Sequence, residues 1–470
     1  MKKKILPLMA FFATLFTFAQ TPCENGFALN YPCDGFDLQS HISLAEMGAS
    51  GGNDSWGWTD PDDGAEYALV GLNNGTAFID ISDPVNPIYL GKLPTQTSSS
   101  TWRDIKVYQD HAFIVSEAGG HGMQVFDLTR LRSVVSPPEN FTVDAHYSGF
   151  GGSHNIVINE ESGYAYSVGD DTFSGGAHII NIQDPLNPIT AGGYSAGGYT
   201  HDAQVIIYDG PDTDYTGKEI FFGSNADHVE IVDMTDKANP VQIASFTYPT
   251  TGYTHQNWLT EDRNYMLLGD EGDEFDFGFN TRTVVFDVSD LDNIQLHMEY
   301  FSETASVDHN GYVIGDTYYL ANYSSGFRTV DINDIENGTM TPSGYFDTHP
   351  SNNNANYSGS WNVYPFFESG NIVISGENGF TLVRDNSVLG SSNFENDNFS
   401  LYPNPAKNNL AISSKIDPIK NIEIFNVLGQ RIINLNFTSS LSENIDISSL
   451  NTGMYLVKIN NLTTKRLIVK

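Results

Sequence analysis

Histidines recur at a regular interval through the middle of the chain, at His154, His201, His255 and His309. Acidic side chains stand at the ends of the alternating segments that follow such positions, at Glu117, Asp170, Asp270 and Glu271. Imidazole and carboxylate groups are suitable ligands for zinc, iron, copper or manganese. If the fold brings them together, they predict a site for a divalent transition metal, which could polarise a substrate or activate a bound water.

Equivalent positions in other segments carry Arg103, followed by Asp104, and Trp361. We interpret these three as ligand-binding residues. The guanidinium of Arg103, a cation among four histidines, would repel a metal but hold an anionic substrate. The alternative is that the recurring histidines are structural and hydrogen-bond neighbouring repeats to each other. A third set is interpreted as surface or edge residues: His111, His121, His178 and His228.

These residues belong to a repeat made of short β-strands. One unit, residues 153–188, reads as strand HNIVI, turn NEESG, strand YAYSV, an acidic loop, strand AHIINI and the ending DPLNP. The aligned positions Arg103, His154, His201, His255, His309 and Trp361 are spaced by 51, 47, 54, 54 and 52 residues. Repeats of about 40 to 50 residues with several short strands are typical of β-propeller blades.

Seven such units predict an all-β fold, a seven-bladed β-propeller. In a propeller the first strand of each blade lines the central channel, and the second strand runs back. The starts of first strands and the ends of second strands therefore meet at one channel mouth, where the histidines and acids above would lie.

The first residues carry Lys2, Lys3 and Lys4 before an apolar run over residues 5–18, which predicts a secretory signal peptide over residues 1–19. The two cysteines, Cys23 and Cys33, follow closely. In an oxidising compartment this spacing favours a local disulfide, and a metal pair is the weaker alternative. No later stretch is apolar for long enough to form a membrane-spanning segment.

Charge divides the chain into two parts. Residues 20–394 hold 52 Asp and Glu against 11 Lys and Arg, whereas residues 395–470 hold 6 acids and 8 bases. An acidic body with so few cations is a poor candidate for binding nucleic acid, which needs clustered Lys and Arg.

Sequence motifs add a family resemblance. The segments FIDISDP, IINIQDP, EIVDMTD and VVFDVSD resemble the LVIVD-type propeller repeat, and residues 22–385 as a whole resemble the bacterial choice-of-anchor B family. The resemblance implies a propeller domain over residues 20–390 but no established activity.

The tail resembles the type A sorting domain of the type IX secretion system of Bacteroidetes-like bacteria, through the motifs YPNP at 402–405, GQ at 429–430 and GMYL at 453–456. This implies a linker over residues 391–398 and a small sorting β-sandwich over residues 399–470. It also implies type IX secretion machinery as partner and an extracellular or outer-membrane surface location. Tail removal would then lead to release or to attachment to surface lipopolysaccharide.

Together these features predict a secreted or cell-surface binding or scaffold module whose His-rich channel mouth holds a metal or small ligand. The alternative is an extracellular metal-dependent hydrolase or oxidoreductase that uses the channel histidines. No GxSxG, HExxH or phosphate-cradling glycine loop occurs, so the sequence leaves enzymatic activity, ligand and oligomeric state open.

Overall fold

The computed structural model describes residues 20–386, 399–414, 418–426, 431–460 and 463–470. The chain divides into two compact units, residues 1–386 and 387–470. The predicted signal peptide over residues 1–19 and the predicted linker over residues 391–398 lie outside the described residues.

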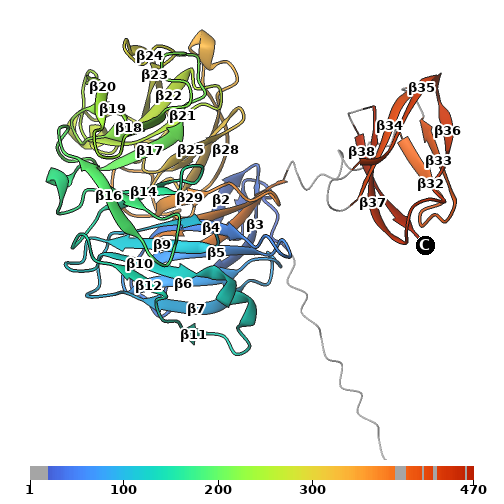
Figure 1. Cartoon of the computed structure of the whole chain (residues 1–470), viewed down its shortest axis with the longest axis horizontal. Coiled ribbons are helices and arrows are strands. Elements are labelled where there is room, and N and C mark those ends of the chain that lie inside the picture. Colours follow the sequence, from blue (N-terminus) through green and yellow to red (C-terminus); the bar gives the residue numbers. More distant parts are fainter. Residues whose placement is uncertain (1–19, 387–398, 415–417, 427–430, 461–462) are drawn as a thin grey trace, which may run out of the picture. The chain divides into compact units, whose positions relative to one another are not determined.

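Most strands of the first unit form four-stranded antiparallel sheets in chain order, as the sheets of residues 202–246 and 254–301 show in Figure 1. One sheet contains β13 (Asn155–Asn159), β14 (Tyr164–Val168), β15 (Ala177–Asn181) and β16 (Ile189–Tyr194). The next contains β17 (Asp202–Ile207), β18 (Glu219–Ser224), β19 (Val229–Asp233) and β20 (Val241–Phe246). A third contains β21 (Thr254–Leu259), β22 (Tyr265–Asp270), β23 (Arg282–Asp287) and β24 (Gln295–Phe301).

Two earlier sheets follow the same order with small additions. The strands β4 (Gly52–Thr59), β5 (Glu66–Leu72), β6 (Gly75–Asp80) and β7 (Ile88–Pro94) are extended by β11 (Glu139–Asn140). The strands β8 (Arg103–Tyr108), β9 (His111–Ser116) and β10 (Met123–Asp127) take β12 (Ala145–Tyr147) as their fourth member. Helices are short: η1 (Leu128–Ser133), η2 (Phe173–Gly175), α1 (Asp273–Asp276) and η3 (Ile335–Asn337).

N-terminal strands complete the last two sheets of this unit. The strands β25 (Gly311–Ile314), β26 (Thr317–Ala321), β27 (Phe327–Asp331) and β28 (Thr341–Phe346) are extended by β2 (Tyr31–Asp34) and β1 (Phe27–Ala28). The strands β29 (Ser360–Tyr364), β30 (Asn371–Gly376) and β31 (Gly379–Asp385) receive β3 (Phe36–Ile42) as their outer strand. Leu38 is paired with Val383 there, so one sheet joins the beginning and the end of the unit.

The first strands of the sheets contact one another in a closed ring. Contacts run in the order β4, β8, β13, β17, β21 and β25, while β29 contacts both β26 and β4. The described residues of this unit form seven sheets around that ring. Apolar side chains fill the space between neighbouring sheets, as where the rings of Phe78 and Phe126 stack at 4.5 Å. The predicted all-β propeller architecture is confirmed by these sheets.

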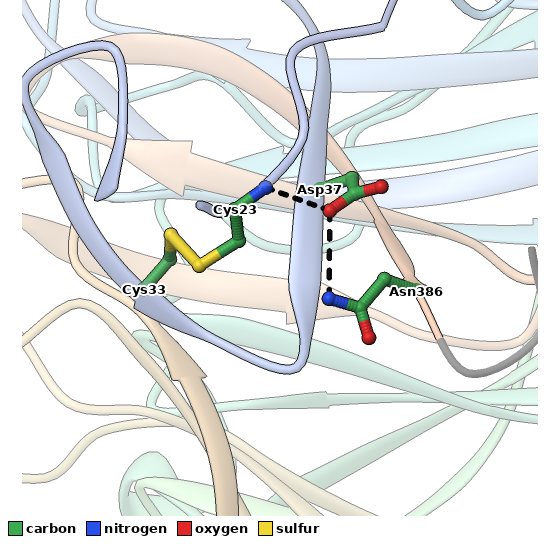
Figure 2. Close-up of a disulfide and its surroundings, with 4 residues drawn as sticks. All are labelled: Cys23, Cys33, Asp37 and Asn386. Atoms are coloured by element: carbon green, nitrogen blue, oxygen red, sulfur yellow. Dashed lines mark hydrogen bonds between the residues drawn. A yellow bond between two sulfur atoms is a disulfide. The ribbon is translucent and has the colours of Figure 1, made fainter. Parts of the chain in front are cut away.

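The predicted disulfide between Cys23 and Cys33 is present and joins cysteines that are ten positions apart in the sequence (Figure 2). The backbone N–H of Cys23 donates to Asp37 Oδ1 at 2.8 Å, and Asn386 Nδ2 donates to the same oxygen at 3.5 Å. Asp37 in β3 therefore ties the disulfide loop to the residue that follows β31.

The second unit is a small β-sandwich. One sheet contains β32 (Phe399–Tyr402), β33 (Asn409–Ser414) and β36 (Ser442–Asp446), and the other contains β35 (Arg431–Ser440), β34 (Ile419–Asn426), β37 (Gly453–Ile459) and β38 (Thr463–Val469). Leu410 and Ile445 from the first sheet share one buried core with Ile422 and Val457 from the second. Among the described residues, no helix has the length and apolar character to cross a membrane.

Candidate metal centre

The four histidines lie in an arc at the starts of successive inner strands. His154, His201 and His309 come just before β13, β17 and β25, and His255 is the second residue of β21. Ring centroids are 4.2 Å apart between His154 and His201, 4.4 Å between His201 and His255, and 4.2 Å between His255 and His309. Trp361 continues the arc at 4.9 Å from His309. The propeller thus brings together imidazoles that lie up to 155 positions apart in the sequence.

Two carboxylates from the second strands reach this arc. Glu271, just after β22, places Oε2 3.7 Å from His255 Nε2 and Oε1 3.9 Å from His309 Nε2. The Tyr323 hydroxyl donates to Glu271 Oε1 at 2.8 Å and fixes its position. Glu117, just after β9, has Oε1 2.6 Å from His154 Nδ1.

His201, His255 and Glu271 form a group that could hold a metal ion. Each offers one ligand atom, and these atoms all lie within 4.8 Å of one another. His201 Nδ1 lies 3.1 Å from the backbone oxygen of His255, an interaction of the kind that orients metal-ligating imidazoles through their second nitrogen. Both ring nitrogens of His255 are buried without a hydrogen-bond partner among the described residues. Such nitrogens are expensive to bury unless something binds them.

Burial sets the protonation of these groups. It lowers the pKa of His201 and His255 well below the usual value and lowers that of His309 to about 3. The imidazoles are therefore neutral, the form that binds a metal. Burial also raises the pKa of Glu271 to about 7, and a bound cation would favour its ionised form.

A pocket of about 340 Å³ opens beside these ligands, lined by Thr101, Trp102, His154, His201, Glu271, His309, Tyr323, Tyr357 and Trp361. Trp102 and Tyr357 are 44% and 56% exposed, so aromatic faces form its rim. The sequence interpretation did not include Trp102, Tyr323 or Tyr357. Trp102 precedes Arg103, Tyr323 lies two residues after β26, and Tyr357 lies in the loop before Trp361. No sequence motif singles out these three residues.

Arg103 does not face this pocket. Its buried guanidinium donates to Leu72 O at 3.1 Å and to Thr95 Oγ1 at 2.8 Å, and contacts His121 Nε2 at 3.0 Å. These partners satisfy the hydrogen-bonding groups of the guanidinium, which lies between two sheets. The interpretation of Arg103 as a ligand-binding residue at the mouth therefore finds no support in the geometry.

Asp104 is likewise directed elsewhere. Its Oδ2 accepts from the backbone N–H of Ile156 at 2.8 Å, and its Oδ1 accepts from Lys106 Nζ at 2.5 Å. Asp104 thus connects β8 to β13 below the histidines, rather than binding a ligand at the mouth.

Asp170 and Asp270 are also separated from the histidine arc, because both carboxylates hold turns. Asp170 accepts from Thr172 Oγ1 and Ser167 Oγ. Asp270 accepts from the Tyr248 hydroxyl at 2.8 Å and from backbone N–H groups of residues 252 and 253. Their assignment as metal ligands is not supported by these positions.

Two histidines interpreted as surface residues are in fact buried. His121 is 0% exposed and contacts Arg103, while His178 is 3% exposed and lies 2.8 Å from the Tyr147 hydroxyl. His121 lies in the turn before β10, whereas His178 is the second residue of β15.

Comparison with known proteins identifies the tail. Residues 400–470 match the secretion system C-terminal sorting domain family, which supports the predicted export by type IX secretion. No curated protein matches the chain.

Two similar solved structures have low identity. A protein from Lactobacillus plantarum is 10% identical with a TM-score of 0.45, over 79% of this chain and 95% of its own. The periplasmic gluconolactonase of Pseudomonas aeruginosa is 13% identical with a TM-score of 0.45, over 62% of this chain and 88% of its own.

Proposed function

We propose that this exported propeller, with its seven sheets as seven blades of the choice-of-anchor B type, holds a divalent transition metal at the histidine mouth and binds a ligand there. His201, His255 and Glu271 would hold the ion. The observation that carries the proposal is the His255 imidazole, which is 1% exposed, has no partner for either nitrogen among the described residues and faces Glu271. Two imidazoles and one carboxylate suit zinc or iron.

The structural alternative is weakened by the residues that follow the histidines, because these already make the polar links between inner strands. Asn155 Nδ2 donates to His201 O at 3.1 Å, and Gln256 Oε1 accepts from the backbone N–H of Gly311 at 2.8 Å. His255 makes no such link through its side chain, so bonding between repeats does not explain its burial.

Metal content tests the proposal directly. We expect the full chain, purified without chelators, to carry close to one equivalent of a transition metal by elemental mass spectrometry. His255→Ala should lose it while remaining folded, and His111→Ala, a histidine outside the arc, should keep it. A folded wild-type protein that neither carries nor takes up metal would refute the proposal.

Thermal unfolding separates a ligand role from a purely structural one. A metal that binds only the folded state adds about 2.7 kcal/mol when its free concentration is 100-fold above Kd. Zinc should therefore raise the Tm of the wild type and leave that of His255→Ala unchanged. A structural histidine would instead lower the Tm on substitution, with no dependence on zinc or chelator in either protein.

A metal-dependent hydrolase or oxidoreductase is the second candidate. It is favoured by the pocket beside the ligands, since a three-residue ligand set leaves coordination positions for water or substrate. Such an enzyme would lose turnover on chelation and in His201→Ala. Chromogenic ester and phosphoester panels and oxygen-uptake assays are the measurements, and activity that survives chelation would contradict this candidate.

The domain assignment predicts how the protein reaches its destination. We propose that the type IX machinery recognises residues 399–470 and removes them, and that the 20–390 propeller is then free or attached to surface lipopolysaccharide. Intact mass of the exported product is the test. A product that retains residues 399–470 would contradict removal, and a sugar-lipid mass increment would distinguish attachment from release.

A further inference from the structure

The opposite mouth of the channel holds a second, larger pocket. Its volume is about 490 Å³, within the range of small-molecule sites. It is lined mainly by the far halves of the same inner strands, including Val107 of β8 and Ile158 of β13, and it reaches inward to Asp202, the first residue of β17. Nothing in the metal proposal uses this pocket.

One side of the pocket is a wall of five aromatic rings, here called the aromatic wall: Trp56, Trp258, Tyr312, Tyr364 and Phe366. The rings meet mostly edge to face, at 5.1 Å between Trp56 and Tyr364 and 4.9 Å between Trp258 and Tyr312. The wall already contacts one ammonium group, because Lys106 Nζ lies 4.6 Å from the centroid of Trp56. Aromatic faces attract cations through the negative potential of the ring.

The polar lining has an excess of unpaired carboxylates. The two cations of the lining are already paired, Lys106 with Asp104 at 2.5 Å and Arg263 with Asp209 at 3.0 Å. Three further acids line the pocket and form no ion pair among the described residues: Glu160, Glu161 and Asp202. Asp202 belongs to an inner strand, and the two glutamates are exposed at the rim.

We propose that this second pocket binds an organic ammonium group, with the aromatic wall against the cation and the three unpaired carboxylates around it. An anionic ligand would be repelled by the same carboxylates. The acidic body of the protein strengthens the preference, because a field of one sign concentrates counter-ions at a cleft. The inference does not use the proposed metal ligands, although Asp202 directly follows His201 in the sequence.

The test is calorimetric titration of the full chain with two cations, choline and 1,5-diaminopentane. The neutral isostere of choline, 3,3-dimethyl-1-butanol, is the matched ligand control. We expect at least one of the two cations to bind, and its affinity to fall as the salt concentration rises. If choline binds, it should bind at least tenfold more tightly than its neutral isostere. Tryptophan fluorescence should change on binding, because Trp56 and Trp258 lie in the wall.

Variants locate the site. Asp202→Asn and the double variant Glu160→Gln, Glu161→Gln should each weaken cation binding at least fivefold. Asp227→Asn, an exposed carboxylate outside the pocket, should leave it unchanged. The paired glutamates are exposed, so their substitution tests the site even if Asp202→Asn fails to fold.

Three results would overturn the proposal: no binding of either cation, equal binding of choline and its isostere, or binding unchanged in both carboxylate variants. Binding of maltotriose in place of the cations would assign the pocket to a neutral saccharide and would also overturn it. Metal content serves as a separate readout, because it reports only on the other mouth.

Discussion

Glu219 joins two neighbouring sheets, and its substitution gives a sharp test of how the ring is held together. The side chain is 3% exposed. Its Oε1 accepts from Asn159 Nδ2 at 3.0 Å, from Ser162 Oγ at 2.8 Å and from the Tyr166 hydroxyl at 2.7 Å. Its Oε2 accepts from Lys237 Nζ at 2.6 Å. One carboxylate therefore connects β18 to the neighbouring sheet and neutralises a nearly buried ammonium.

Glu219→Gln preserves the shape but directs an amide group, or a neutral oxygen, at Lys237. Breaking a buried ion pair by removing one partner costs about 3–5 kcal/mol. Unfolding entropy of about 2.1 cal/mol/K per residue, over roughly 370 residues, gives about 0.8 kcal/mol/K. If the propeller unfolds as one unit, a loss of about 4 kcal/mol lowers the Tm by about 5 °C.

The assay is scanning calorimetry of the wild type, Glu219→Gln, Lys237→Met and the double variant. We expect the double variant to recover at least half of the loss seen in Glu219→Gln, because no ammonium is then left unpaired. The matched control is Asp209→Asn, whose partner Arg263 forms an exposed pair worth at most about 1 kcal/mol. A Tm shift below about 1 °C in Glu219→Gln, or strict additivity in the double variant, would refute this account of the contact.

Three further results are expected. Burial, with the Arg103 cation beside it, lowers the pKa of His121 to about 4. Neutral His121 therefore contributes fully to the free energy of unfolding above about pH 6.5, and this contribution is lost as the pH falls toward 4. The loss reaches about 3 kcal/mol, and Tm against pH should be flatter in His121→Gln over that window. Cys23→Ser opens the loop closed with Cys33 and should cost about 3 kcal/mol, with reductant lowering the Tm of the wild type but not of the variant. Phe126→Ala removes a ring stacked on Phe78 and should cost about 3–5 kcal/mol by denaturant unfolding, whereas Phe126→Leu should cost less.

The periodicity of the sequence predicted most of the fold. The alternation in HNIVI and YAYSV fixes which residues face neighbouring sheets, and the repeat of about fifty residues fixes the order of the strands. Periodicity could not predict the position of β3, because its residues pair with residues of β31 that lie 338 to 349 positions away, and no local sequence pattern indicates that partner.

At the candidate metal centre the sequence pointed to the four histidines, Glu117 and Glu271, because they recur at equivalent ends of strands, and the structure places these side chains in one arc. It could not separate Glu271 from Asp270, since adjacent residues at a strand end point in different directions. The side chain of Arg103 is directed away from the pocket for a similar reason. The repeat aligns its backbone with the histidines, but its longer side chain reaches the partners that the neighbouring sheet offers.

The pairing of β3 with β31 has a consequence for the order of events in the life of the chain. The last sheet lacks its outer strand until residues 36–42 and 379–385 are both free to meet, so the ring cannot close on a chain that is still emerging. Long-range pairing of this kind is slow, since a large loop must be ordered before any contact rewards it. The ring therefore stays open until nearly all of the first unit is available, whereas the sheets built from consecutive strands can form earlier.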